Sequence, residues 1–158
     1  MVAVAIWLRV EVSALPDLAE LDPQDAATLL LDEHDDAWIA ALADELDRRL
    51  SGRELERTLR VWNLSRTELG RILGVSRQAL SKWIETGVPA DRVTQVADLA
   101  SLTDLLTRYV KRDRIPAVVR RTAPNLGDRA LIGLIEEGRT AEAVVLTRLM
   151  FTFADAHG

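Results

Sequence analysis

The chain has 158 residues, of which 48% are hydrophobic and 28% are charged, as in a globular protein with one domain or two small ones. It contains no cysteine, which excludes disulfides, thiolate metal sites and thiol catalysis, and its two histidines lie far apart, so no metal site is expected. No apolar run approaches the roughly 18 residues that span a membrane. The apolar start MVAVAIWLRVEV lacks the basic residues of a signal peptide, so we expect a cytoplasmic protein.

The net charge of −5 is unevenly distributed along the chain. Residues 1–50 carry 3 basic and 12 acidic side chains, residues 51–88 carry 7 and 4, and residues 89–158 carry 10 and 9. Screening over about 8 Å at physiological salt means that a distant acidic segment need not cancel a basic face. The positive charge of the middle segment is nevertheless small for a protein that neutralises several phosphates. If the chain binds DNA, it is therefore expected to act as a homodimer or within a larger complex.

The acidic N-terminal 50 residues contain two expected helices. Val2 to Val12 is rich in β-branched residues, which favours a short strand, but a helical or disordered arm fits the same residues equally well. Asp22 followed by Pro23 is a typical helix start, and Asp35 or Asp36 caps the next helix. This segment is expected to be an arm for dimerisation or for a partner.

The spacing of Ser51 and Glu54 matches a capping box and predicts that a further helix begins there and ends at Asn63. Ser65 and Glu68 have the same spacing, so another helix is expected to start at Arg66. It should stop at Gly74, because the residue after a helix often adopts a positive φ.

Ser76 is the expected N-cap of a second short helix, in which Ala79, Leu80 and Trp83 point inward. Two short helices joined by such a tight turn predict a helix-turn-helix, which places its second helix in the DNA major groove. Gly70 is expected where the two helices approach closely.

Polar side chains on the outer face of this predicted motif are candidates for DNA binding. The candidates on the second helix, for base edges and phosphates, are Arg77, Gln78, Ser81 and Lys82. Arg66 and Thr67 begin the first helix, where free backbone N–H groups can bind a phosphate. The alternative is that all six form ordinary solvated surface.

The remainder of the chain is also expected to be helical. Gly87 and Pro89 separate the second short helix from a long apolar helix, Pro116 starts a short helix that Pro124 ends, and residues 128–156 form two helices separated near Gly138. A basic group could contact DNA or an acidic partner, or form a solvated hinge; it comprises Arg108, Lys111, Arg112, Arg114, Arg120 and Arg121. The expected protein is all-α, with an N-terminal extension (1–50), a helix-turn-helix domain (51–110) and a C-terminal domain (111–158).

Two segments together resemble the Xre-type antitoxins of bacterial RES–Xre toxin–antitoxin pairs, the MbcA/ParS/Xre group. One is the helix-turn-helix followed by KWIETGVPADRVTQVADLASL, and the other is NLGDRALIGLIEEGRTAEAVV. The matching positions of the second segment are Leu126, Gly127, Arg129, Leu134, Gly138 and Arg139. The chain departs from the family pattern at Leu131, where the family has proline, and near Arg120, where it has tryptophan.

The resemblance implies an antitoxin that binds and blocks a RES-domain, NAD-degrading toxin and represses its own promoter by binding operator DNA. The candidate toxin-binding residues in the C-terminal segment are Arg129, Arg139, Arg148, Phe151 and Phe153. The two phenylalanines could instead close the core. No nucleophile stands beside a base and no loop is built to hold phosphate, so neither an enzyme nor a cofactor is expected. The alternatives are a stand-alone dimeric helix-turn-helix repressor and an adaptor that uses this motif to bind protein.

Overall fold

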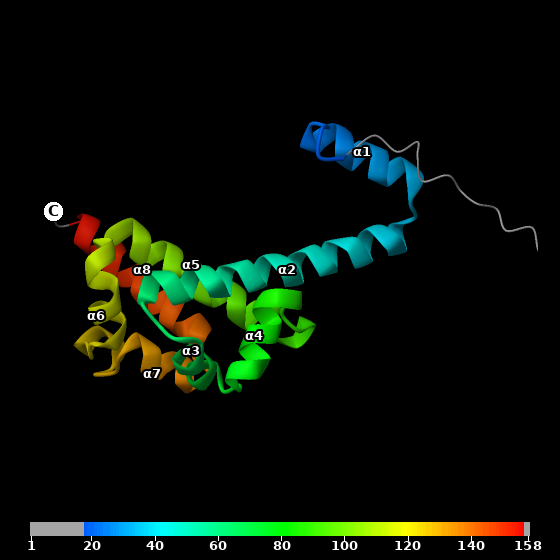
Figure 1. Ribbon diagram of the computed structural model, residues 1–158. Helices are drawn as coiled ribbons and strands as arrows, with labels where there is room; N and C mark the ends of the chain where they lie inside the picture. Colours follow the sequence, from blue (N-terminus) through cyan, green and yellow to red (C-terminus); the bar gives the residue numbers. More distant parts are fainter. Residues whose placement is uncertain (1–17, 157–158) are drawn as a thin grey trace, which may run out of the picture. The chain divides into compact units, whose positions relative to one another are not determined.

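A computed structural model describes the backbone of residues 18–156 and the side chains of residues 18–152 (Figure 1). Between residues 18 and 156 the secondary structure consists of helices and 3-10 turns with no strand, so the all-α prediction is confirmed for this range. The strand considered at Val2 to Val12 lies outside it. None of the helices within the described range is long and apolar enough to cross a membrane.

The helices follow one another in a simple order. They are α1 (Pro23–Glu33), α2 (Asp36–Trp62), α3 (Arg66–Leu73), α4 (Arg77–Thr86), α5 (Val93–Tyr109), α6 (Ile115–Arg120), α7 (Leu131–Glu136) and α8 (Thr140–Ala156). The 3-10 turns are η2 (Ala90–Arg92), η3 (Arg112–Arg114) and η4 (Pro124–Leu126). The helix expected from Pro89 thus begins as a 3-10 turn and becomes α-helical at Val93. The break expected near Gly138 is confirmed, with that glycine at φ 76° between α7 and α8.

The chain divides into two compact units, residues 1–42 and residues 43–158. In the first unit, Asp22 caps α1 by accepting a hydrogen bond of 2.9 Å from the Gln24 N–H, and Asp35 accepts one of 2.8 Å from the Trp38 N–H. Both predicted caps are confirmed. No side chain from residue 18 to residue 42 is buried, so these helices have no core of their own.

Helix α2 corrects one expectation, because it runs without a break through Ser51, where a new helix was predicted. Ser51 is 9% exposed and lies inside the helix, and a Cβ on the next residue, Gly52, would lie 2.7 Å from the Trp83 carbonyl oxygen. The missing side chain of Gly52 therefore lets the end of α4 approach α2. The prediction that Asn63 ends this helix is confirmed, since it has φ 51°.

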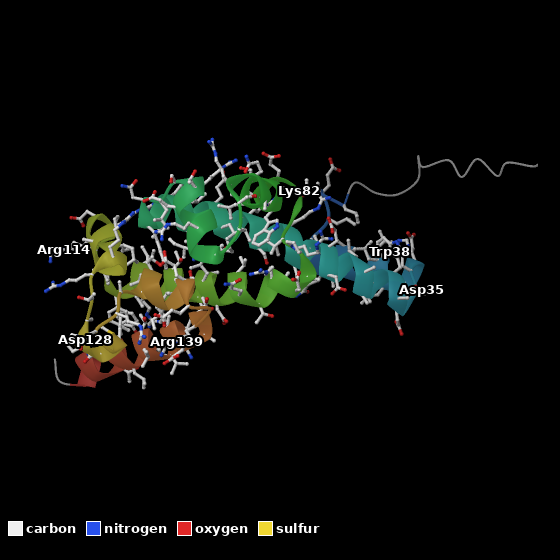
Figure 2. All side chains as sticks on the ribbon, turned by 90° about the horizontal axis from the view of Figure 1, so that it is seen from below. Asp35, Trp38, Lys82, Arg114, Asp128 and Arg139 are labelled. Carbon is white, nitrogen blue, oxygen red and sulfur yellow. The ribbon has the colours of Figure 1, made fainter. Side chains whose placement is uncertain are left out.

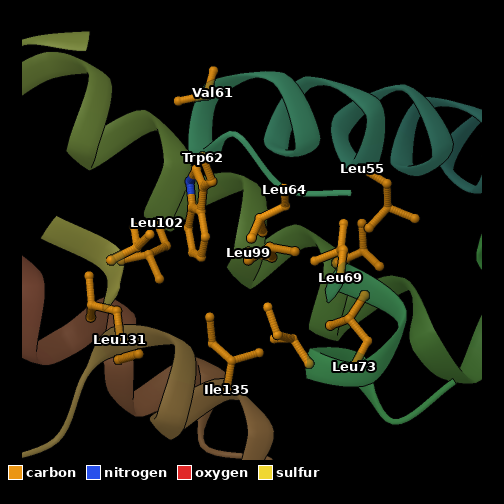
Figure 3. Packing of buried hydrophobic residues seen from close by; sticks show 14 of the residues in the cluster. Leu55, Val61, Trp62, Leu64, Leu69, Leu73, Leu99, Leu102, Leu131 and Ile135 are labelled. Carbon is orange, nitrogen blue, oxygen red and sulfur yellow. The ribbon is translucent and has the colours of Figure 1, made fainter. Parts of the chain in front are cut away.

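The core of the second unit is continuous from α2 to α8 (Figure 3). Its buried side chains include Trp62, Leu99 and Leu102 from the N-terminal half and Leu131 and Ile135 from the C-terminal half. Residues 51–110 and 111–158 thus contribute to one hydrophobic cluster, and α8 packs mainly against α5.

Arg120 joins two parts of this unit through backbone carbonyls. Its Nη1 donates to the carbonyl oxygens of Trp62 at 3.2 Å and Pro116 at 2.8 Å, and its Nη2 donates to that of Asn63 at 3.1 Å. The last carbonyls of a helix lack partners within the helix, so this guanidinium completes the end of α2. Arg120 therefore has a structural role that sets it apart from the rest of the basic group.

Candidate functional site

Helices α3 and α4 form a closely connected pair whose caps match the sequence prediction. Glu68 N–H donates to Ser65 Oγ at 3.1 Å and Ser65 N–H donates to Glu68 Oε2 at 2.8 Å, which completes the predicted capping box. The hydrogen bond from the Ser65 backbone N–H to the Glu68 carboxylate, followed by the interaction of that carboxylate with the Ser65 side chain, is the main reason that the pKa of Glu68 lies below its usual range. Gly74 ends α3 with φ 70°, and Ser76 caps α4 by accepting a bond of 3.0 Å from the Ala79 N–H.

The turn between the two helices is held tightly against α3. A Cβ on Gly70 would lie 2.8 Å from the Val75 carbonyl oxygen, so the close approach predicted at Gly70 involves the turn itself. Leu80 and Trp83 of α4 are buried, as expected for the inner side of this helix. The buried side fixes which residues of α4 face outward.

Arg77, Gln78 and Lys82 of α4 are exposed and line an open surface hollow together with Ser81 (Lys82 is labelled in Figure 2). Arg66 and Ser81 are half-buried, and Arg66 Nη1 donates to Ser81 Oγ at 3.0 Å, which ties the start of α3 to α4. The sixth predicted DNA-binding residue, Thr67, is exposed at the start of α3. Glu85 also lines the hollow, but Arg77 and Lys82 outnumber it and form no ion pair within the described chain, so this surface is suited to bind an anion.

A second charged site connects η4, α7 and α8. Glu137 accepts a hydrogen bond from Arg129 Nε at 2.8 Å and one from Arg139 Nη1 at 2.9 Å, while Arg139 binds both carboxylate oxygens of Glu142 at 2.7 Å. The hydrogen bonds from Arg139 are the main reason that the pKa values of Glu137 and Glu142 are lowered. The same hydrogen bonds, to Glu142 first and then to Glu137, raise the pKa of Arg139. We call these four residues the Arg129–Glu142 cluster. Arg139 is labelled in Figure 2.

The two glutamates of this cluster were not singled out in the sequence as site residues. Glu137 follows α7 directly and lies at the end of that helix. The alternation of charges in EEGRTAE is a local signal for paired side chains, but the pairing with Arg129 depends on how η4 folds back.

The neighbouring Glu136 connects this region to the α3–α4 pair. Its Oε1 lies 2.5 Å from Arg71 Nη1 of α3, and α7 packs directly against α3.

The other predicted toxin-binding residues lie outside the cluster. Phe151 stacks on Tyr109 with ring centroids 4.6 Å apart and lines an apolar cavity of about 250 Å³, in which the buried Thr147 hydroxyl has no hydrogen-bond partner. Arg148 is exposed in a separate groove between α5 and α8, beside Arg108. The side chain of Phe153 lies outside the described residues. The structure therefore brings together Arg129 and Arg139 only.

No group of three or more acidic or histidine side chains among the described residues is arranged to hold a metal ion.

Comparison with known proteins supports a relationship at the level of the fold. No family model matches the sequence, and no curated protein matches it significantly. The structure matches a chain in the crystal structure of the M. tuberculosis MbcT-MbcA toxin–antitoxin complex, with a TM-score of 0.53 and 20% sequence identity, over 63% of this chain and 91% of that chain. The predicted resemblance to the MbcA group is thereby confirmed: this chain shares the fold of a protein from a toxin–antitoxin complex.

Proposed function

We propose that this protein is the antitoxin of a toxin–antitoxin pair, a binding protein and not an enzyme, and that it also represses its own operon. The observation that carries the proposal is the combination of the fold match with an exposed basic face on α4 and a separate charged cluster at the C-terminal end. Two distinct polar surfaces on one small unit suit a protein that binds two different partners.

The α3–α4 pair acts in this proposal as a helix-turn-helix with α4 in the major groove. Arg77 and Gln78, in the first turn of α4, reach base edges, while Lys82 contacts phosphate. The bond from Arg66 to Ser81 holds these two side chains in place before DNA binds, so that they contribute orientation as well as contact. Thr67 offers its backbone N–H to a phosphate at the start of α3.

The partner in this proposal is a RES-domain toxin that degrades NAD. Arg129 and Arg139 of the Arg129–Glu142 cluster are the proposed anchors, because paired guanidinium groups held by carboxylates are preorganised for a polar partner surface. Phe151 and the apolar cavity beside it could accept an apolar side chain of the same toxin.

The deciding experiment is expression of the adjacent reading frame with and without this chain, with growth and cellular NAD as readouts. We expect the neighbour alone to stop growth and deplete NAD, and co-expression to restore both. A harmless neighbour, or toxicity that this chain fails to relieve, would contradict the proposal. Binding to an inverted repeat without any copurifying partner would then favour the stand-alone dimeric repressor.

Substitution of Arg77 by alanine is expected to weaken operator binding by about 1–3 kcal/mol if this residue reads a base, and Lys82→Ala should reduce the salt dependence by about one phosphate contact. Fluorescence anisotropy at several salt concentrations measures both effects. The matched control is Arg60→Ala, which removes an exposed charge on α2 outside the candidate sites. Equal losses for Arg77 and Arg60 would indicate diffuse electrostatic binding, and unchanged binding by the Arg77/Lys82 double variant would favour the adaptor hypothesis.

Substitution of Arg139 by alanine is expected to raise the Kd for the toxin by at least about tenfold, as for a central charged residue of an interface. Arg139→Lys should recover part of the affinity, because lysine keeps the charge but cannot bind Glu142 through two nitrogens. Titration calorimetry with the purified toxin measures this, and DNA binding should not change. A toxin affinity equal to that of the unmodified protein would remove the cluster from the interface.

A further inference from the structure

The apolar cavity beside Phe151 is large for a close-packed protein interior. Its volume is about 250 Å³, and its walls include the buried side chains of Leu106 from α5, Leu126 from η4 and Leu131 from α7. Met150 and Phe151 of α8 also line it. Voids larger than a water molecule are few in protein interiors. A cavity of about 150 Å³ with similar walls binds benzene, so this one has room for about eight to ten carbon atoms.

Thr147 of α8 contributes a buried hydroxyl to the wall of this cavity. The residue is 2% exposed, and its Oγ1 has no hydrogen-bond partner. Other helical threonines donate at 2.9 or 3.0 Å to the carbonyl oxygen four residues earlier, namely Thr28, Thr86, Thr103, Thr107 and Thr152. Thr147 does not make this bond. Because a buried hydroxyl without a partner is unfavourable, a polar atom of a bound molecule is the partner that the described chain does not supply.

Arg121 supplies a positive charge where the cavity meets the surface. This arginine lines the cavity and is exposed, as are the neighbouring lining residues Thr122 and Pro124. Within residues 18–152 its guanidinium forms no ion pair, whereas that of Arg120 is held by three backbone carbonyls. A guanidinium is always charged and binds a carboxylate through two nitrogens.

We propose that this cavity binds a small amphipathic carboxylate with an apolar chain of about eight to ten carbons. The apolar chain occupies the cavity, and the carboxylate is bound by Arg121. A carboxylate has two oxygens that each accept more than one hydrogen bond, so it also accepts from the Thr147 hydroxyl. The exposed Arg121 side chain has no partner to hold it elsewhere and follows the bound carboxylate.

Other occupants satisfy only part of this site. An apolar side chain of the toxin would fill the same space but would leave the Thr147 hydroxyl buried without a partner. A small inorganic anion would pair with Arg121 but would leave the apolar walls unfilled. The site goes beyond the proposed function, because it needs neither toxin nor DNA. Where a toxin side chain enters the cavity, it and the carboxylate exclude each other.

Met150 allows binding to be observed inside the cavity. The full-length chain contains two methionines, Met1 and Met150, so protein labelled with ¹³C at the methionine methyl groups gives two signals, and Met150→Leu assigns them. We expect sodium octanoate, below its micellar concentration, to shift the Met150 signal with a Kd on the order of 0.1–1 mM, as for a ligand of about ten non-hydrogen atoms. The uncharged 1-octanol should bind at least about tenfold more weakly.

Two substitutions test the polar groups separately. Arg121→Ala should weaken octanoate binding by about tenfold, while Arg53→Ala, which removes an exposed charge on α2 outside the cavity, should not change it. Thr147→Val keeps the shape of the side chain and should weaken binding by about three- to tenfold. The same variant should raise the Tm of the unliganded protein, because it removes the unpartnered hydroxyl. A threonine with a purely structural role would not combine these two effects.

Four results would overturn the inference. They are a Met150 signal that does not shift in a saturable way up to about 10 mM octanoate, octanol that binds as tightly as octanoate, Arg121→Ala that binds octanoate like Arg53→Ala, and Thr147→Val that binds it like the unmodified protein. Because the experiment uses neither toxin nor DNA, its failure would leave the proposed antitoxin function standing.

Discussion

Replacement of Trp62 by alanine is expected to lower the free energy of unfolding by about 3–5 kcal/mol, the range for a large aromatic side chain lost from a core. Trp62 is fully buried at the end of α2, and in the view of Figure 3 its ring lies between Leu64 and Leu102. Its Nε1 has no hydrogen-bond partner, so its contribution comes from apolar contacts. These contacts join α2 to the helices that follow, and a cavity here would loosen the whole second unit.

Trp38→Ala is the matched control for this loss. Trp38 is 42% exposed and stacks on His34 with ring centroids 3.7 Å apart. Removal of its ring should lower the free energy of unfolding by less than about 1 kcal/mol, as for substitutions away from a packed core. Urea unfolding followed by far-UV circular dichroism compares the two, because neither substitution removes the signal. Equal losses would mean that the first unit shares the stability of the second, contrary to the absence of buried side chains from residue 18 to residue 42.

The α3–α4 pair could be predicted in detail because each of its signals is local. Ser65 and Glu68 complete their capping box within one turn, Gly74 needs only its own positive φ, and Ser76 caps the adjacent α4. None of these features depends on a distant part of the chain. Consequently the bounds of both helices and the exposed side of α4 followed from spacing.

Ser51 shows where the same reasoning fails. Its spacing to Glu54 repeats that of a capping box, yet α2 continues through it: Ser51 lines the groove between α2 and α5, and the end of α4 approaches the next residue, Gly52. A serine that lets another helix approach and a serine that caps a helix look alike in sequence. The difference is decided by tertiary packing over more than thirty residues, which periodicity does not register.

The two candidate sites also differ in whether local sequence signals could predict them. The exposure of Arg77 and Lys82 follows from the position of Leu80 and Trp83 on the opposite side of one helix. The Arg129–Glu142 cluster depends on how the segment after η4 brings Arg129 to Glu137, so only the resemblance to a family pointed to Arg129 and Arg139, and nothing pointed to Glu137 as their link.

Gly52→Ala is expected to destabilise the protein even though alanine is the better helix former. A glycine inside a helix ordinarily costs about 1 kcal/mol relative to alanine, so the substitution would be favourable on an open helix surface. At Gly52 the added Cβ would lie 2.7 Å from the Trp83 carbonyl oxygen and 3.2 Å from that of Ile84. Both atoms belong to backbone, which cannot move aside as a flexible side chain would. We therefore expect a net loss of about 1–3 kcal/mol, as for overpacked sites.

Gly133→Ala supplies the opposite sign in the same protein. Gly133 lies within α7, and no atom lies within 4 Å of a Cβ placed there, so alanine should stabilise the chain by about 0.5–1 kcal/mol. The midpoint of urea unfolding should fall for Gly52→Ala and rise for Gly133→Ala, with equal slopes. A higher midpoint for both variants would show that α4 does not approach α2 at Gly52. That contact could then no longer explain why α2 continues through this region. Since the end of α4 is positioned by this contact, Gly52→Ala should also weaken operator binding, whereas Gly133→Ala should leave it unchanged.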